Sequence, residues 1–142
     1  MSPHAEILQA VVARLRAQNV AGQRVYDRAP ANVPFPHVEV GEMQTVRDDA
    51  SCLPHRGETF VTIHVWSRPG QGPAGAAPGL PGSVQGKQLI GQVTEALHEH
   101  ALNLPGWIVS RCAVEGVRDF IEPDGVTQHG VVTLMIRAHA NI

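Results

Sequence analysis

The sequence has no surplus of basic residues and no long apolar run. Its 142 residues include 11 Lys and Arg against 13 Asp and Glu, a formal net charge of −2. Proteins that grip nucleic acid usually present a basic surface, so general DNA affinity is not expected. No segment approaches the ~18 uninterrupted apolar residues of a membrane span, and residues 1–6 do not resemble the start of a signal peptide. We therefore expect a protein of the cytoplasm with no membrane partner.

Cysteine is also scarce. The chain has only Cys52 and Cys112, far apart in the sequence. A lone pair in a chain of this length gives weak support for a disulfide. Cys112 lies in an apolar stretch and is predicted to be a small core residue.

Patterns that carry catalysis or bind metals are missing from the sequence. The serines lack a glycine-flanked elbow, and the glycine-rich tract lacks the lysine and spacing of a P-loop. His98 and His100 are two apart on a predicted helix, whereas a helical zinc pair needs a spacing of four. Other histidines lie on or next to different predicted strands, where two can meet through the strand register: His37, His64, His129 and His139. We predict no catalytic residue, no metal and no cofactor.

What the sequence does contain is a strong strand pattern over Glu58–Trp66. Val61, Ile63 and Val65 alternate with polar and aromatic residues, and this period of two is typical of a strand. Bulky side chains on both faces predict an interior strand, with one face against helices and the other partly covered.

The other elements can be placed around this strand. Apolar residues at helical spacing predict two amphipathic helices, and shorter alternating segments predict further strands. The helices are expected over 3–18 and 84–102, and the strands over 24–27, 36–41, 107–118 and 130–140. This order predicts a two-layer α+β fold, in which a mostly antiparallel sheet of about four to five strands has both helices on one face and carries long hairpin arms.

Three connections have distinct compositions. The long polar segment 42–57 is either a solvated hairpin arm or an arm that docks on a neighbour, and the sequence leaves both possibilities open. Glu122–Gly125 is predicted to be a tight turn. The Pro/Gly-rich segment 69–82 buries too little to offset its ordering entropy, so we expect a mobile loop within a single domain over residues 1–142.

Several blocks together resemble a known family. They are Val-Tyr-Asp at 25–27, Pro-Phe-Pro-His-Val-Glu-Val-Gly at 34–41, Ile-His-Val-Trp-Ser-Arg at 63–68, and the segment from Asp119 through Asp124-Gly125 to Val132. With the two helices, this pattern resembles the tail-completion or tail-terminator family of long-tailed phages and phage-derived gene transfer agents. The resemblance covers nearly the whole chain. The segment 69–82 departs from the family pattern, which has a short link there.

The resemblance implies a structural protein that is not an enzyme. Family members form a ring, usually six-fold, at the head-proximal end of the tail tube. The implied partners are further copies of the same chain, the major tail tube protein, and the head connector or stopper protein. DNA crosses the lumen without specific binding, and a slightly acidic subunit suits that passage because a basic lumen would hold phosphates. The protein would assemble in the cytoplasm and end in the tail of the released particle.

A closed ring of identical subunits needs two different contact patches on each subunit. The two predicted hairpins are suitable arms for such contacts. The candidate subunit or partner interface residues are Arg47, Asp48, Asp49, His55, Arg56, Arg68, Glu122 and Asp124.

Two alternatives remain. One is another ring of the same junction, such as a stopper or an adaptor. The other is a small cytoplasmic α+β domain that binds a ligand or catalyses a reaction, with its site beneath the Pro/Gly segment. That second alternative predicts an apolar pocket that holds ionisable groups with shifted pKa values.

Overall fold

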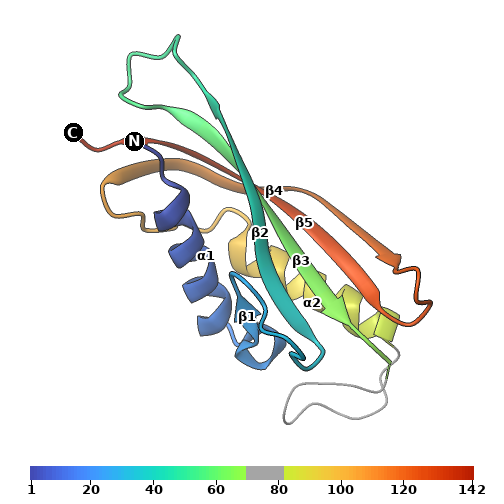
Figure 1. Cartoon of the computed structure of the whole chain (residues 1–142). Helices are drawn as coiled ribbons and strands as arrows, with labels where there is room; N and C mark the ends of the chain where they lie inside the picture. Colours follow the sequence, from blue (N-terminus) through green and yellow to red (C-terminus); the bar gives the residue numbers. More distant parts are fainter. Residues whose placement is uncertain (70–81) are drawn as a thin grey trace.

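The computed structural model describes residues 1–69 and 82–142, and its centre is a long twisted sheet with the helices on one face (Figure 1). The strand order is β1-β2-β3-β5-β4, and all neighbours are antiparallel except β1 and β2. The elements are α1 (His4–Ala17), a 3-10 helix η1 (Val20–Gln23), β1 (Val25–Tyr26), β2 (His37–Arg47), β3 (Gly57–Ser67), α2 (Gly82–Leu97), β4 (Trp107–Ile121) and β5 (Gln128–Ala140). The predicted α+β fold is confirmed.

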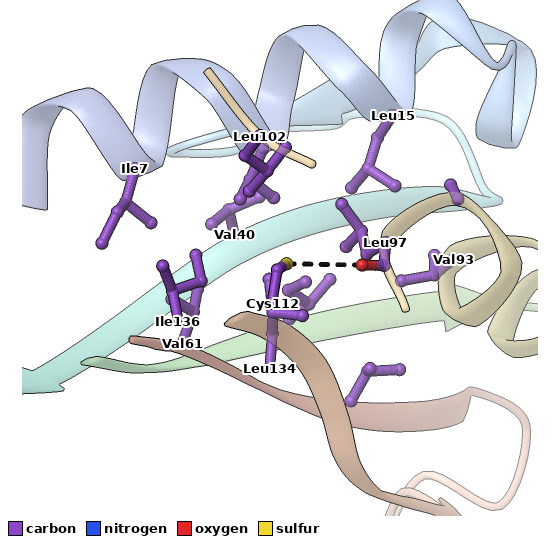
Figure 2. Close-up of a cluster of buried hydrophobic side chains, with 14 of the residues drawn as sticks. Ile7, Leu15, Val40, Val61, Val93, Leu97, Leu102, Cys112, Leu134 and Ile136 are labelled. Atoms are coloured by element: carbon purple, nitrogen blue, oxygen red, sulfur yellow. Dashed lines mark hydrogen bonds between the residues drawn. The ribbon is translucent and has the colours of Figure 1, made fainter. Parts of the chain in front are cut away.

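The core lies between the sheet and the two helices (Figure 2). On β3, Val61 and Ile63 are fully buried, and β3 is an interior strand between β2 and β5, as predicted. The helices bury the apolar stripes that their sequences show, including Leu15 on α1 and Val93 on α2. Helix formation and strand pairing are thus both stabilised by burial of one apolar layer.

Cys112 is part of this core. Its side chain is buried on β4, and Sγ donates a hydrogen bond of 3.3 Å to the carbonyl oxygen of Leu97 (Figure 2). Burial, with a smaller contribution from nearby Glu99, raises the pKa of the Cys112 thiol to about 11. The predicted role as a small core residue is confirmed. Cys52 is exposed, and both cysteines are free.

Two glycines allow α2 to lie close to the sheet. A β-carbon at Gly130 would lie 2.6 Å from Cδ1 of Ile90, and one at Gly86 would lie 2.8 Å from Oγ of Ser67. Both distances are shorter than a van der Waals contact, so any larger residue would push the helix away. At Gly91, by contrast, a β-carbon would have no described atom within 4 Å.

The predicted polar connection over 42–57 is wrong in its extent. β2 continues to Arg47 and β3 begins at Gly57, so only residues 48–56 form the loop. The register shifts between Val40 and Met43. This bulge adds one residue to β2, so the side chains after it lie on the opposite faces from those that a strict period of two would give them. Beyond it, Thr45 pairs with Thr59, and their hydroxyls lie 2.8 Å apart.

The second helix is also shorter than predicted, because α2 ends at Leu97. Glu99 adopts a positive φ of 53°, and its N–H donates to the carbonyl oxygen of Cys112. The chain therefore turns toward β4 about one helical turn before Ala101, the last residue of the predicted apolar stripe. Ala101 is exposed.

The predicted mobile loop over 69–82 falls almost wholly outside the described residues and stays a prediction. Within the described ranges, no helix combines the length and apolar character that a membrane crossing requires.

Candidate functional site

A row of rings crosses the sheet face opposite the helices, which we call the open face. The strand register places His37 on β2 opposite Trp66 on β3, Trp66 opposite His129 on β5, and His129 opposite Phe120 on β4. The centroids of the Trp66 and His129 rings are 3.8 Å apart and the rings are stacked. The corresponding separations are 6.4 Å for His37–Trp66 and 4.9 Å for Phe120–His129. Four strands thus contribute one ring each to a single line.

Arginine side chains lie at both ends of this row. The guanidinium of Arg68 is 4.3 Å from the ring centroid of Phe35, which in turn packs 5.1 Å from His37. At the other end, the guanidinium of Arg118 is 5.8 Å from the ring centroid of Phe120. Cations over aromatic faces are attracted by the ring quadrupole, so these contacts hold both ends of the row in place.

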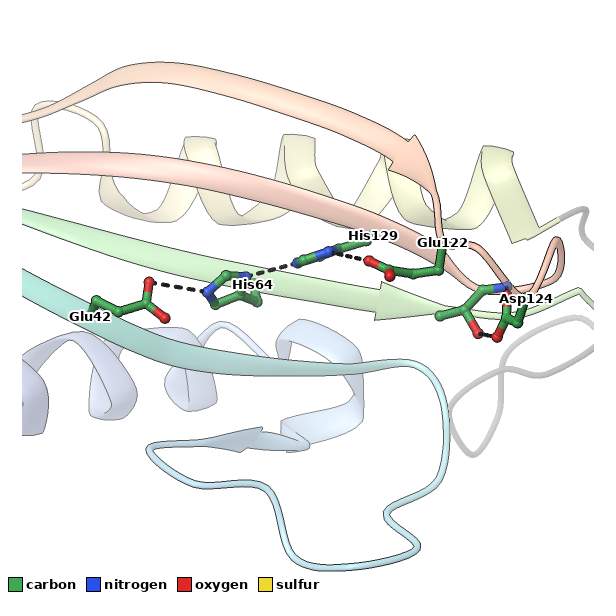
Figure 3. A network of polar contacts seen from close by, with 6 residues as sticks. Glu42, His64, Glu122, Asp124 and His129 are labelled. Carbon is green, nitrogen blue, oxygen red and sulfur yellow. Dashed lines mark hydrogen bonds and ion pairs between the residues drawn. The ribbon is translucent and has the colours of Figure 1, made fainter.

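A chain of polar contacts runs along the same face (Figure 3). Nδ1 of His129 lies 2.6 Å from a carboxylate oxygen of Glu122, and its Nε2 lies 2.8 Å from Nδ1 of His64. If His129 donates from Nδ1 to the carboxylate, its Nε2 must accept the proton of His64 Nδ1. The Nε2 atom of His64 then carries a lone pair toward Glu42, whose oxygen is 3.4 Å away.

The buried histidines favour the neutral state. Burial lowers the pKa of His129, and the nearby His64 lowers it further, while the hydrogen bond to Glu122 acts in the opposite direction. Burial also lowers the pKa of His37. Both rings are therefore neutral at neutral pH, which suits stacking against Trp66.

These shifts predict a loss of stability in mild acid. A histidine with a lower pKa in the folded than in the unfolded state binds fewer protons when folded, so the free energy of unfolding falls as pH falls. The fall should begin near the ordinary value of 6.5 and continue to the folded-state pKa. Urea unfolding at pH 7.5 and 5.5 would measure it, and His129→Gln should reduce the difference. His55→Asn, in the exposed hairpin loop, should keep the full difference in the free energy of unfolding between the two pH values, since the buried histidines remain. A pH difference equal in His129→Gln and the wild type would contradict the assignment.

The first five predicted interface residues gather at one end of the sheet, at the tip of the β2–β3 hairpin. The guanidinium of Arg47 lies 3.2 Å from Asp49, and that of Arg56 lies 3.7 Å from Asp48. His55 is exposed in the same loop. We call this group the hairpin-tip cluster.

The other three predicted residues meet at the opposite end of the sheet, near the β4–β5 turn. The guanidinium of Arg68 lies 3.8 Å from Asp124 and donates from Nε to Oγ1 of Thr127 at 3.0 Å. Hydrogen bonds from the Thr127 hydroxyl and from the N–H groups of Thr127 and Val126 lower the pKa of Asp124 to about 2. Glu122 belongs to the polar chain through His129. We call Arg68, Glu122 and Asp124 the turn cluster. The full length of β3 separates the two clusters.

The open-face row itself was not predicted from the sequence. Its signal was partly visible, because His64 and Trp66 are two apart on a predicted strand and must share a face. Partners on the other strands depend on register, which the pattern within one strand does not give.

Features expected of a metal or ligand site have little support in the described part of the chain. There, no group of three or more His, Cys, Asp or Glu side chains is placed to hold a metal ion. Grooves of about 390 and 360 Å³ border α1, and the buried His37 and His129 line neither of them.

Comparisons with known proteins agree on the family and the fold. The family described as "Tail completion protein gp17" matches residues 9–139. No curated protein sequence matches the chain. A chain of the solved structure described as "Virion of native gene transfer agent (GTA) particle" superposes with a TM-score of 0.77 over 93% of each chain, at 16% sequence identity. At this identity the likeness shows a shared fold.

Proposed function

Because the chain belongs to the Tail completion protein gp17 family, whose members are structural proteins of phage tails, we propose that it forms a ring at the head-proximal end of the tail tube. There it would end tube growth and join the tail to the head connector. The observation that carries this proposal is the family match over residues 9–139. The shared fold with a chain of a gene transfer agent virion supports it.

The positions of the two charged clusters fit a subunit that lies between two partners. The hairpin-tip cluster and the turn cluster lie at opposite ends of the sheet. A subunit whose sheet runs along the ring axis turns these two ends toward opposite sides of the assembly. We propose that one cluster contacts the tube protein and the other contacts the connector.

The ring would consist of copies of this chain, six in the proposed assembly, and DNA would pass through its lumen without specific binding. The net charge of −2 supports such passage, since the subunit has no basic excess to hold phosphates. We also propose that residues 1–142 form one domain, because strands from both sides of residues 70–81 pair in one sheet. Assembly would occur in the cytoplasm, and the protein would leave in the tail of the particle.

Gold labelling of particles tests this placement directly. Ile142 is 85% exposed, so a short epitope tag after it should be accessible without disturbing the core. We expect gold particles at the junction of head and tail in electron micrographs. Label at the distal tail tip or on the head shell would overturn the proposal, as would particles that lack the tagged chain. The tagged strain must first yield as many particles as the untagged one.

A further inference from the structure

β4 ends the sheet on one side and exposes apolar side chains there. Among the described residues β4 pairs only with β5. On its outer edge the carbonyl of Cys112 accepts from the N–H of Glu99 and the N–H of Val114 donates to His98, but no described strand pairs with this edge. Val117 and Ile121 are 49% and 61% exposed, and they pair with Val132 and Gln128. This pairing puts both on the helix side of the sheet. In a monomer, an exposed edge strand with apolar side chains promotes aggregation. These features are typical of a surface that a partner covers.

The first turn of α2 extends this surface. α2 runs antiparallel to β4: Leu97 at its end contacts Cys112, and Lys87 near its start lies 2.9 Å from the carboxylate of Asp119. Val84, one turn before Lys87, is 40% exposed, and the antiparallel run of α2 places it toward the end of β4 that carries Ile121. We call Val84, Val117 and Ile121 the β4 stripe.

The opposite edge of the sheet carries a groove. β1 is only two residues long, and α1 lies next to it on the helix side. An open groove of about 390 Å³ runs along the outer surface of α1. We call it the α1 groove, and it is lined by Leu8, Gln9, Val12, Ala13, Arg16 and Asp27.

The stripe and the groove occupy opposite edges of one sheet but the same face of it. A second copy can be placed beside the first so that the β4 edge of one sheet adjoins the β1 edge of the next. The two helix layers then lie side by side, and the stripe of one copy faces the groove of the next. The charges do not oppose this contact. Lys87 and Asp119 beside the stripe form an ion pair with each other, and Arg16 and Asp27, which line the groove, carry opposite charges, so neither side presents a net charge that would repel the other.

We propose that the β4 stripe of one copy docks in the α1 groove of the next copy, and that this contact closes the ring. The inference rests on the proposed ring function and names its lateral contact. A contact between two different patches generates a closed ring when its rotation permits, whereas a contact of one patch with itself stops at a dimer. The hairpin-tip and turn clusters then remain free for the tube and the connector.

Cysteine crosslinking in purified particles tests this contact. In a Cys52→Ser background, Ala13→Cys places a thiol in the groove and Val117→Cys places one in the stripe; native Cys112 is only 3% exposed and should not react. The double variant, treated with a short bismaleimide, should give a ladder of covalent multimers that ends at the number of subunits in the ring. Each single variant should stay monomeric on a denaturing gel, since the contact joins position 13 to position 117 and neither to itself.

A matched control uses Val46→Cys in place of Val117→Cys. Val46 is 52% exposed on β2, near the hairpin tip and away from the stripe, and its pairing with Ala13→Cys should give no ladder. No ladder from the stripe–groove pair in particles that contain the protein and have joined tails would overturn the contact but leave the tail role standing. Absence of the wild-type chain from purified particles would overturn the ring function and the contact with it.

Discussion

Deletion of the gene should leave full heads beside unjoined tails, many of them longer than in the parent strain, with nearly complete loss of joined particles. Each ring of a tail tube presents the same surface to the next, so growth by repeated head-to-tail contacts has no inherent end. A terminating ring supplies a different upper surface and stops this repetition. Without it the tube continues, and the connector finds no docking partner. Negative-stain electron microscopy of lysates would measure tail length and the fraction of joined particles.

Complementation provides the control for this deletion. A plasmid copy of the wild-type gene should restore tail length and joining to the parental values. Unjoined tails of normal length would instead indicate a stopper or adaptor role at the same junction. Joined and infectious particles from the deletion strain would contradict any role in tail completion and would redirect attention to the grooves along α1.

Truncation of Leu134 to alanine should lower the free energy of unfolding by about 2–5 kcal/mol. Leu134 is fully buried on β5, opposite Val61 of the central strand β3 (Figure 2). Removal of its branched end loses apolar burial and leaves a cavity between sheet and helices that the packed neighbours can fill only in part. Urea unfolding followed by circular dichroism would measure the effect, with an unchanged slope against urea showing that the unfolded state is comparable.

The same substitution at an exposed leucine is the matched control. Leu53 is 38% exposed in the β2–β3 loop, so Leu53→Ala should change the free energy of unfolding by no more than about 0.5 kcal/mol. A loss of less than about 1 kcal/mol for Leu134→Ala would contradict the described core, because a fully buried leucine at the centre of the sheet cannot be removed at so little cost.

Much of the fold could be predicted because it depends on local patterns. The alternation of Val61, Ile63 and Val65 was enough to predict an interior strand, and the helical spacing of Ile7, Val11 and Leu15 predicted the buried face of α1. Local patterning was less reliable where elements end. The β2 alternation breaks at the bulge after Val40, and this break made a strand look like part of a loop.

The role of the candidate interface residues stays a prediction. The structure places these residues in two clusters at opposite ends of the sheet. The α1 groove and the β4 stripe had no sequence signal, because only the packing of α2 along β4 brings Val84 toward the end of β4 that carries Ile121.

By itself the sequence determined the buried faces of α1 and β3, most of the buried face of α2, and the family to which the chain belongs. Only the tertiary structure decided which side chains meet across the sheet. His37, Trp66, His129 and Phe120 form one row because the register of three strand pairs aligns them. Register follows from loop lengths and from the bulges in β2 and β4, and a shift of one residue would send these rings to the opposite face. Periodicity within one strand identifies a face, whereas contacts between strands are set by the packing of the whole chain.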